Sequence, residues 1–417
     1  MDADLLVTNI RQLATPTGTG ASRGHAMDAV DVLYNMAMVV AGERIVWMGP
    51  QTDVAALPGS ATIEIDAHGH AVIPALVDPH THGIWRGDRL EDFDARSRGA
   101  SYQEILSRGG GIWNTIRATM DAPGRSDEQW LATLAEERIR HLIRSGAATI
   151  EMKSGYGFIK EGEIRSLEAI RIVAEQSLAT IIPTLLIHVP PIDPGDRDDY
   201  LVMVTDDLIP EVAKRKLAEA VDVFIEEDAF SADEAVRIFT AARNAGLRVK
   251  AHADQFAVIG GVEAALEFNA LSVDHLEATM DDDEIAAIAA SDTVAVLLPG
   301  ASLHLGMPSA PGRDLIDAGA AVAVGTDLNP GSSPLFSTQL AMALAVRMND
   351  LTVSEALTAA TANAAAALGL TDRGRLRVGQ RADFIVTEYA DWRDAVYQMG
   401  ANPVQELFIG GRETEFP

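Results

Sequence analysis

Apolar residues recur with two different periods along this chain, and the change of period divides it into three parts. Near both ends, short runs alternate apolar and polar residues, which is the pattern of strands with one buried face. These runs cover residues 5–9, 37–40, 44–48, 62–65, 383–387 and 404–409. Turn residues separate them, notably Gly42 in the first part and Gly410 with Gly411 in the last. We therefore expect the two termini to pair into one small β-sandwich.

The middle of the chain alternates between strands and helices. The expected strands are runs of small and β-branched apolar residues, at 71–77, 147–152, 181–187, 221–225, 247–251, 271–273, 294–298 and 321–324. Helical periodicity fills the intervals, as at 126–144, 163–175, 231–245 and 282–290. Regular alternation over this length favours a closed parallel barrel. A doubly wound open sheet is the alternative, but no glycine-rich dinucleotide motif follows the first barrel strand.

The chain has 417 residues, which is more than one ordinary hydrophobic core requires. The two patterns together predict an α/β protein with two domains. Residues 73–368 would form a (β/α)8 TIM-like barrel. Residues 1–72 and 369–417 would together form the β-sandwich.

The composition narrows the class of protein. Hydrophobic residues make up 47% of the chain, but no run approaches the roughly 18 apolar residues of a membrane span. The formal net charge of −28 opposes binding to nucleic acid or to an anionic membrane. The N-terminus lacks the basic and apolar regions of a secretory signal, and the absence of cysteine excludes disulfides and thiolate ligands. We expect a cytoplasmic protein with no nucleic-acid or membrane partner.

Four polar side chains follow apolar strands and are candidate metal ligands: His80, His82, His252 and Asp327. His80 and His82 lie on the same side of an extended segment, because side chains alternate with period two. Taken singly, His252 reads as a hydrogen-bonded core residue and Asp327 as a helix cap. The carboxyl ends of barrel strands meet at one mouth, however, and there the four could close around one divalent metal with room for a reactive water. This pattern predicts a metal-dependent hydrolase.

Several motifs resemble those of the amidohydrolase superfamily. They are the H-x-H pair, the later His252, His275 in a V-D-H segment, and the final Asp327. The K-S-G-Y-G motif at 153–157 and the D-L-N-P-G-S-S motif at 327–333 are similar to the imidazolonepropionase family, and the similarity covers essentially the whole chain. The resemblance implies one Zn²⁺ or Fe per subunit, held by the four candidate ligands, and a homodimer. It also implies hydrolysis of 4-imidazolone-5-propionate to N-formimino-L-glutamate in histidine degradation.

The same resemblance implies a set of substrate contacts: Arg89, Tyr156, His188, Gln255, Asn329, Gly331 and Ser332. Arg89 could bind the substrate carboxylate with two hydrogen bonds, although a surface pair with Glu91 or Asp92 is the ordinary alternative. Tyr156 could pack in its loop, His188 could be a satisfied loop histidine, and the last three residues could simply form a turn. Leu186 and Ile187 before His188 are larger than we expect in the family.

Gln255 and His275 determine how protons would move. Related deaminases carry Glu at the place of Gln255, and an uncharged amide cannot act as a base. We therefore expect Gln255 to orient the substrate, Asp327 to take the proton, and His275 to polarise the carbonyl. Asp327 and His275 are the expected catalytic residues.

Three alternatives remain open at this point. The first is another mononuclear amidohydrolase, such as a deaminase or lactamase acting on a different nitrogen heterocycle. The second is a binding protein without catalysis on the same barrel. The third is a dinuclear enzyme with a carboxylated lysine, for which Lys153 is the plausible candidate.

Overall fold

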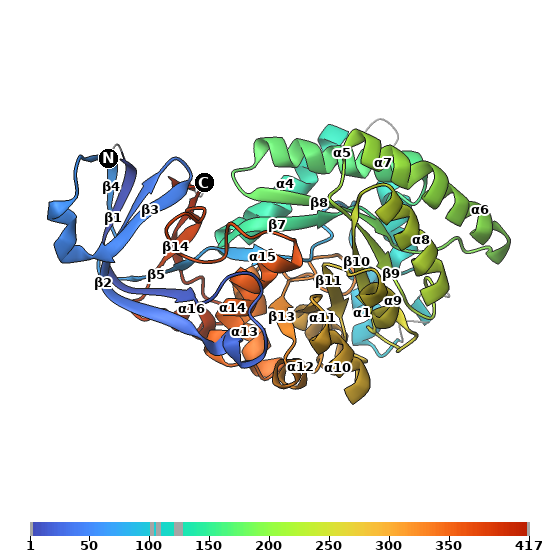
Figure 1. The fold of residues 1–417 in the computed structure, drawn as a ribbon. Coiled ribbons are helices and arrows are strands. Elements are labelled where there is room, and N and C mark those ends of the chain that lie inside the picture. The colour runs from blue at the N-terminus through green and yellow to red at the C-terminus, as the bar shows by residue number, and fades with distance from the viewer. Residues whose placement is uncertain (1–2, 101–103, 106–109, 121–127, 415–417) are drawn as a thin grey trace.

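The computed structural model describes residues 3–100, 104–105, 110–120 and 128–414. Two β-sheets lie side by side along an elongated molecule (Figure 1). One sheet contains segments from both ends of the chain, and the labelled N- and C-termini lie near each other at that end. The other sheet is surrounded by helices and forms the larger part (Figure 1).

The larger sheet has eight parallel strands that follow one another in chain order. They are β6 (Leu76–Asp78), β7 (Ala147–Lys153), β8 (Thr180–Ile187), β9 (Ala220–Phe224), β10 (Arg248–Ala253), β11 (Ser272–His275), β12 (Val294–Leu297) and β13 (Ala321–Val324). Most of their residues are buried, as expected for parallel strands with side chains packed on both faces. The predicted strands are confirmed to within a few residues.

The first and last strands meet at their carboxyl ends, and this contact closes the barrel. Thr81 forms a parallel bridge with Leu328. The Asp327 N–H donates to the His80 carbonyl at 3.0 Å, and the His82 N–H donates to the Leu328 carbonyl at 2.9 Å. The prediction of a closed (β/α)8 barrel is confirmed, and the open-sheet alternative is wrong.

Helices cover the outside of the barrel. Those that follow its strands are α1 (Leu90–Ser97), α3 (Ile112–Met120), α4 (Glu128–Arg144), α5 (Lys160–Gln176), α6 (Arg197–Val202), α7 (Ile209–Arg215), α8 (Ala232–Asn244), α9 (Gly261–Glu267), α10 (Asp282–Ala290), α11 (Pro299–Leu305), α12 (Gly312–Ala318), α13 (Thr338–Met348), α14 (Val353–Thr358) and α15 (Ala364–Ala367). A further helix, α16 (Asp394–Tyr397), lies near the C-terminus and packs against α13. The four predicted helices correspond to α4, α5, α8 and α10. The expected start of the first, Ser126, lies outside the described residues.

The smaller sheet joins both ends of the chain. Its strands are β1 (Ala3–Pro16), β2 (Val30–Ala41), β3 (Arg44–Pro50), β4 (Ala61–Asp66), β5 (Ala71–Pro74), β14 (Phe384–Thr387), β15 (Val404–Ile409) and β16 (Arg412–Glu413). The order is β16-β15-β14-β5-β1-β2-β3, and β4 pairs with β1. Gly42 and Glu43 form the expected hairpin turn between β2 and β3. The pairing of the two termini is confirmed.

The apolar run at 71–77, predicted as one strand, contributes to both sheets. β5 pairs with β1 and β14, whereas β6 pairs with β7 in the barrel. Ala75 lies between them and donates its N–H to the Asp383 carbonyl. The single strand was wrong because local hydrophobicity does not show which neighbour a strand pairs with. The domain division at residues 1–72, 73–368 and 369–417 remains a prediction.

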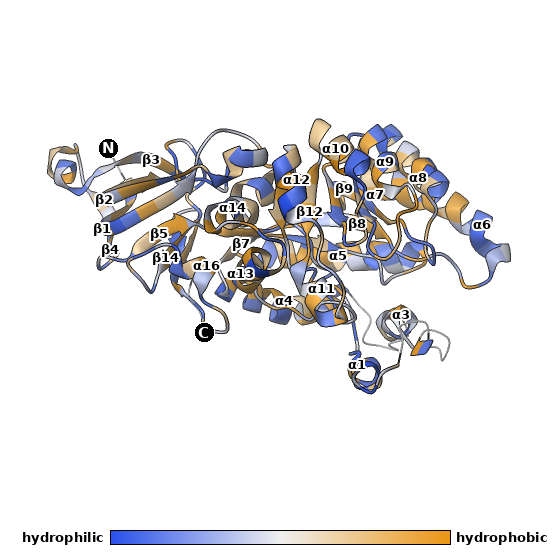
Figure 2. Ribbon diagram, turned by 90° about the horizontal axis from the view of Figure 1, so that it is seen from below, coloured by the Kyte–Doolittle hydropathy of each residue, from blue (hydrophilic) through white to orange (hydrophobic). Residues whose placement is uncertain are grey.

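Figure 2 shows α1 and α3 standing out from the body of the barrel in that view. Both follow β6 in the chain and therefore lie on the side of the carboxyl ends of the barrel strands. Across the described residues, no helix combines the length and the apolarity needed to cross a bilayer.

Candidate active site

Four side chains predicted as metal ligands converge at the carboxyl ends of the barrel strands. The His82 Nε2 atom lies 3.3 Å from the Nε2 atoms of both His80 and His252. The Asp327 Oδ1 atom lies 3.2 Å from His82 Nε2 and 3.5 Å from His80 Nε2. Thr81 lies between His80 and His82, and Leu328 follows Asp327. The bridge between Thr81 and Leu328 that closes the barrel therefore sets the spacing between the histidines and the aspartate.

Two buried carboxylates hold the imidazoles by their other ring nitrogens. Asp274 Oδ2 lies 2.6 Å from His80 Nδ1, and Asp222 Oδ1 lies 3.0 Å from His252 Nδ1. These contacts leave the Nε2 atoms directed toward one another. Burial lowers the pKa of His80 well below its ordinary value, that of His82 to about 3 and that of His252 to about 4. The imidazoles are therefore neutral near pH 7 and can act as metal ligands.

The arrangement fits a divalent metal ion. Two ligand atoms at about 2.0–2.1 Å from a tetrahedral ion lie about 3.3 Å apart, which matches the Nε2 separations. Within the described residues, Asp327 Oδ1 is buried and accepts no hydrogen bond. Fully buried carboxylate oxygens are normally paired, so an oxygen in this position is suited to a cation. His80, His82 and Asp327 also satisfy the spacing of a metal-binding group.

A buried ionic network lies beneath the imidazoles. Lys153 Nζ lies 2.7 Å from Asp222 Oδ2 and 2.6 Å from Glu151 Oε2. Lys250 Nζ lies 2.8 Å from Glu151 Oε1, and all four side chains are almost fully buried. Burial opposes the charge on Lys153, but the carboxylates Asp222 and Glu151 outweigh it and raise the pKa. Lys153 is thus an ammonium group, and a carboxylated Lys153 would instead place a negative charge between these two carboxylates.

His275 lies at the end of β11 and is paired with Glu277. Its Nδ1 atom lies 3.2 Å from Glu277 Oε2, and both side chains are buried. Burial opposes the charged imidazolium, but the Glu277 carboxylate outweighs it and raises the pKa of His275 to about 9. His275 therefore carries a positive charge near pH 7 and differs in this from the other three histidines.

The loop after β13 folds around Asp327. The Asn329 side-chain amide donates to the Asp327 carbonyl at 2.7 Å, and its oxygen accepts the N–H groups of Gly331 and Ser332. The Ser332 hydroxyl donates to Asp327 Oδ2 at 3.2 Å. Asn329 thus holds the loop, and Ser332 orients the carboxylate so that its other oxygen faces the imidazoles.

Arg89 caps the start of α1 and reaches the same loop. Its Nε atom is paired with Asp92, which was the ordinary alternative considered for it. Its Nη1 atom lies beside Gly331, so close that a Cβ on this glycine would lie 3.1 Å away. The guanidinium is therefore both ion-paired and placed next to the Asp327 loop.

Tyr156 and His188 lie close to the imidazole of His82. The Tyr156 ring centre lies 5.3 Å from that of His188 and 6.2 Å from that of His82. His188 is stacked on His82 at 5.3 Å. Burial lowers the pKa of His188 well below its ordinary value. Gln255 is buried in the segment after β10, so it too lies at this end of the barrel.

Several residues of the site were not identified from the sequence. They are Asp222, Asp274, Glu277, Glu151 and Lys250. Four of these are ionisable residues inside buried barrel strands, and Glu277 stands two residues after His275. A charged residue in the middle of a strand buried on both faces is unusual, and this signal could have marked them.

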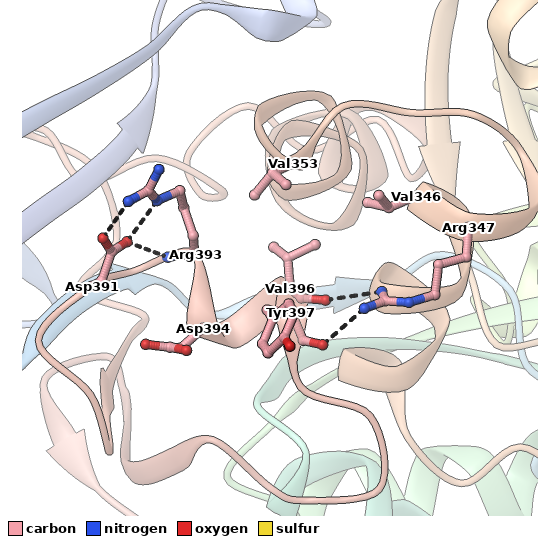
Figure 3. Close-up of a pocket in the computed structure, with 8 residues that line it drawn as sticks. All are labelled: Val346, Arg347, Val353, Asp391, Arg393, Asp394, Val396 and Tyr397. Carbon is pink, nitrogen blue, oxygen red and sulfur yellow. Dashed lines mark hydrogen bonds and ion pairs between the residues drawn. The ribbon is translucent and has the colours of Figure 1, made fainter.

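A separate surface pocket lies away from this site, between α13, α14 and α16 (Figure 3). It has a volume of about 390 Å³. Its arginines are engaged within the protein: Arg393 pairs with Asp391, and Arg347 donates to the carbonyls of Val396 and Tyr397. The convergent ligand atoms therefore identify the barrel mouth, and not this pocket, as the candidate active site.

Comparison with known structures agrees with the fold. An adenosine deaminase from Xanthomonas campestris with bound zinc matches with a TM-score of 0.72 and 17% identity, over 99% of this chain and 93% of that one. A 5-methylcytosine deaminase from Klebsiella pneumoniae matches with a TM-score of 0.73 and 16% identity, over 98% and 96%. At these identities, the likeness concerns the architecture alone.

Comparison of sequences identifies the family. Residues 71–414 match the model of the amidohydrolase family. The chain is 54% identical over 411 residues to the imidazolonepropionase of Deinococcus radiodurans, covering 99% of this chain and 100% of that protein. It is 41% identical to the imidazolonepropionase of Chloroflexus aggregans, covering 98% of each. The chain therefore belongs to the amidohydrolase family, and within it to the imidazolonepropionases.

Proposed function

We propose that this protein hydrolyses 4-imidazolone-5-propionate to N-formimino-L-glutamate, a step in histidine degradation. One observation carries the proposal: a chain 54% identical to an imidazolonepropionase over its full length brings three neutral imidazoles and a carboxylate together at the barrel mouth. The enzyme is thus a hydrolase that acts on a cyclic amide.

The proposed ligands of one divalent metal per subunit are His80, His82, His252 and Asp327. Nitrogen and oxygen donors of this kind suit both Zn²⁺ and Fe, and we propose one of these two as the native ion. A divalent ion held there supplies Lewis-acid activation of water, which makes water nucleophilic near neutral pH.

The protein's own residues would move the protons and steady the charge. The Asp327 carboxylate accepts a proton from the attacking water, and burial, which raises its pKa, makes it a better base than an exposed carboxylate. As the oxygen adds to the ring carbonyl carbon, the charged His275 stabilises the negative charge on the carbonyl oxygen. The protonated Asp327 then returns the proton to the ring nitrogen, and the C–N bond breaks.

The remaining site residues are proposed to bind the substrate. Arg89 would hold the propionate carboxylate, because its guanidinium lies beside the loop that carries Asp327. Tyr156 and His188, which lie beside His82, and Gln255, which follows β10, would position the ring. The further contacts proposed from the Asp327 loop are Asn329, Gly331 and Ser332.

The substrate is a small molecule, and we propose a cytoplasmic homodimer without nucleic-acid or membrane partners. The net charge of −28 supports the absence of nucleic-acid and membrane partners, because it repels phosphate-rich polymers and anionic lipids. Sedimentation of the purified protein tests the dimer.

A product assay tests the function. Purified protein loaded with Zn²⁺ or Fe should consume imidazolonepropionate and form N-formimino-L-glutamate, with no release of ammonia. Ammonia release without ring opening would favour the deaminase alternative, and tight metal binding with no turnover would favour the binding protein. His252→Ala and Asp327→Ala should each abolish turnover, and full activity in either variant would refute the proposed centre.

A further inference from the structure

A buried carboxylate behind the candidate site, Glu163, has no place in the mechanism above. It lies in the first turn of α5 and is 2% exposed. Its two oxygens accept hydrogen bonds from the backbone N–H groups of Gly155, at 2.8 Å, and Phe158, at 2.7 Å. The nearby Ser154 hydroxyl and Gly157 N–H also favour the ionised carboxylate, although burial raises its pKa. One side chain thus gathers the polar groups on both sides of Tyr156.

The loop and the helix also touch through their backbones. A Cβ on Gly157 would lie 2.2 Å from the carbonyl carbon of Gly162, and a Cβ on Gly162 would lie 2.1 Å from the Gly157 carbonyl oxygen. Only glycine at both positions permits this approach. The close contact brings the first turn of α5 near enough for the Glu163 carboxylate to reach the loop amides.

The clamped loop carries one candidate substrate contact and holds a second. Tyr156 stands between the two amides that bind Glu163, and its ring centre lies 5.3 Å from that of His188. The Leu186 N–H, two residues before His188, donates to the Ser154 hydroxyl at 3.3 Å. Leu186 packs against Gly155 on another side, so the larger residue before His188 fills space against this loop. A shift of Gly155 would therefore displace both Tyr156 and His188.

We propose that Glu163 is a positioning residue for substrate binding: its carboxylate clamps the loop at 154–158 onto α5 and so fixes Tyr156 and His188 at the mouth of the barrel. The inference rests on the proposed function, because it assigns these two side chains to the substrate. Glu163 itself touches neither the substrate region nor a proposed metal ligand through any contact found among the described residues.

The first test replaces Glu163 by Gln, which keeps the shape but loses the charge and one acceptor. We expect KM for imidazolonepropionate to rise about tenfold, the size of one lost hydrogen bond to a charged group, with kcat changed by less than about threefold. Metal content should stay the same. The matched control is Glu355→Gln, since Glu355 is also 2% exposed and accepts a backbone N–H at a helix start, but on α14. An unchanged KM in Glu163→Gln, or lost metal, would overturn the inference.

The second test asks whether Glu163 acts through Tyr156. If it does, Glu163→Gln should weaken binding much less in a Tyr156→Phe background than in the parent protein, because the interaction being positioned is already missing. Any effect of Glu163→Gln that is left in this background would come from the displacement of His188. If the fold-change in KM of the double variant equals the product of the two single-variant fold-changes, Glu163 acts independently of Tyr156. That result would refute the clamp.

The third test measures hydrogen exchange in the parent protein and requires neither a variant nor an activity assay. In the parent protein the amides of Gly155 and Phe158 should exchange with deuterium at least about a hundredfold more slowly than freely exposed loop amides. Fast exchange at both would refute the clamp even if the enzyme hydrolyses imidazolonepropionate. Slow exchange in a protein that does not hydrolyse it would leave the clamp intact and refute only the proposed function.

Discussion

At the scale of single residues, Asp222 links the ionic network to the candidate ligands. One of its oxygens contacts His252 Nδ1 and the other contacts Lys153. A carboxylate that binds Nδ1 fixes the orientation of the ring and makes Nε2 a stronger electron-pair donor to a metal ion. The candidate ligand His252 could be inferred from the sequence, because it stands at the end of a strand. Its partner Asp222 could not be paired with it, because the two lie on different strands and only the barrel brings them together.

Replacing Asp222 by Asn should weaken metal binding more than folding. The amide keeps the shape but loses the charge that attracts both Lys153 and the imidazole. We expect the affinity for Zn²⁺, measured by competition with a chelator, to fall about 10–100-fold. Asp383→Asn is the control, since Asp383 is a buried carboxylate in the segment before β14, paired with Arg381. Equal affinities for Asp222→Asn and the parent would contradict the assigned role.

The ion pairs of Lys153 predict one metal ion per chain. Its ammonium group is buried between Glu151 and Asp222, and a reaction with carbon dioxide would first require it to lose its proton. Metal analysis should give about one ion per chain, both with and without added bicarbonate. Two ions per chain that depend on bicarbonate would instead support the dinuclear alternative.

At the scale of elements, the strands and helices follow closely from the sequence pattern. β12 (Val294–Leu297) and α10 (Asp282–Ala290) match their expected ranges because β-branched runs and an acidic helix start act locally. The split of residues 71–77 into β5 and β6 is not determined by the local sequence. Both halves are apolar, and the choice of sheet depends on β1, β14 and β7, which are distant in sequence.

The start of α8 predicts a stability effect that depends on pH. Arg197, the first residue of α6, binds the Glu234 carboxylate, and this hydrogen bond lowers the pKa of Glu234 to about 2. An ionised Glu234 therefore stabilises the fold above its ordinary pKa of 4.5, and this contribution disappears as the pH falls from about 4.5 to about 2.

Glu234→Gln tests this directly, because the amide keeps an oxygen for the cap at Ser231 but cannot form the ion pair. Near pH 7 the variant should unfold at a lower denaturant concentration than the parent. Its free energy of unfolding should be lower by about 1 kcal/mol or less, because the ion pair is partly exposed. The difference from the parent should shrink below pH 4.5. Asp233→Asn removes an exposed charge from the same turn as a control. A difference that stays constant down to pH 2 would contradict the assignment.

At the scale of the whole molecule, the barrel interior has a charge imbalance that a divalent ion would correct. The cluster of candidate ligands and their supports contains four buried carboxylates, Glu151, Asp222, Asp274 and Asp327, but only two ammonium groups, Lys153 and Lys250. The His275–Glu277 pair adds no net charge, so two negative charges remain when all of these groups are ionised. Burial raises the pKa of Asp274 to about 6, in keeping with the cost of burying a carboxylate charge.

Metal removal should therefore destabilise the entire barrel and not only stop turnover. The proposed ligands come from the segments after β6 and β13 and from β10, so one ion joins the two closing strands to the opposite wall. At a free concentration of one hundred times Kd, Zn²⁺ should stabilise the folded state by about 2.7 kcal/mol, seen as a higher Tm. Mg²⁺ should give a much smaller shift, because it prefers oxygen ligands. Asp327→Ala should lose most of the zinc-dependent shift. A Tm that is the same with and without zinc would mean that the four side chains converge for some other reason.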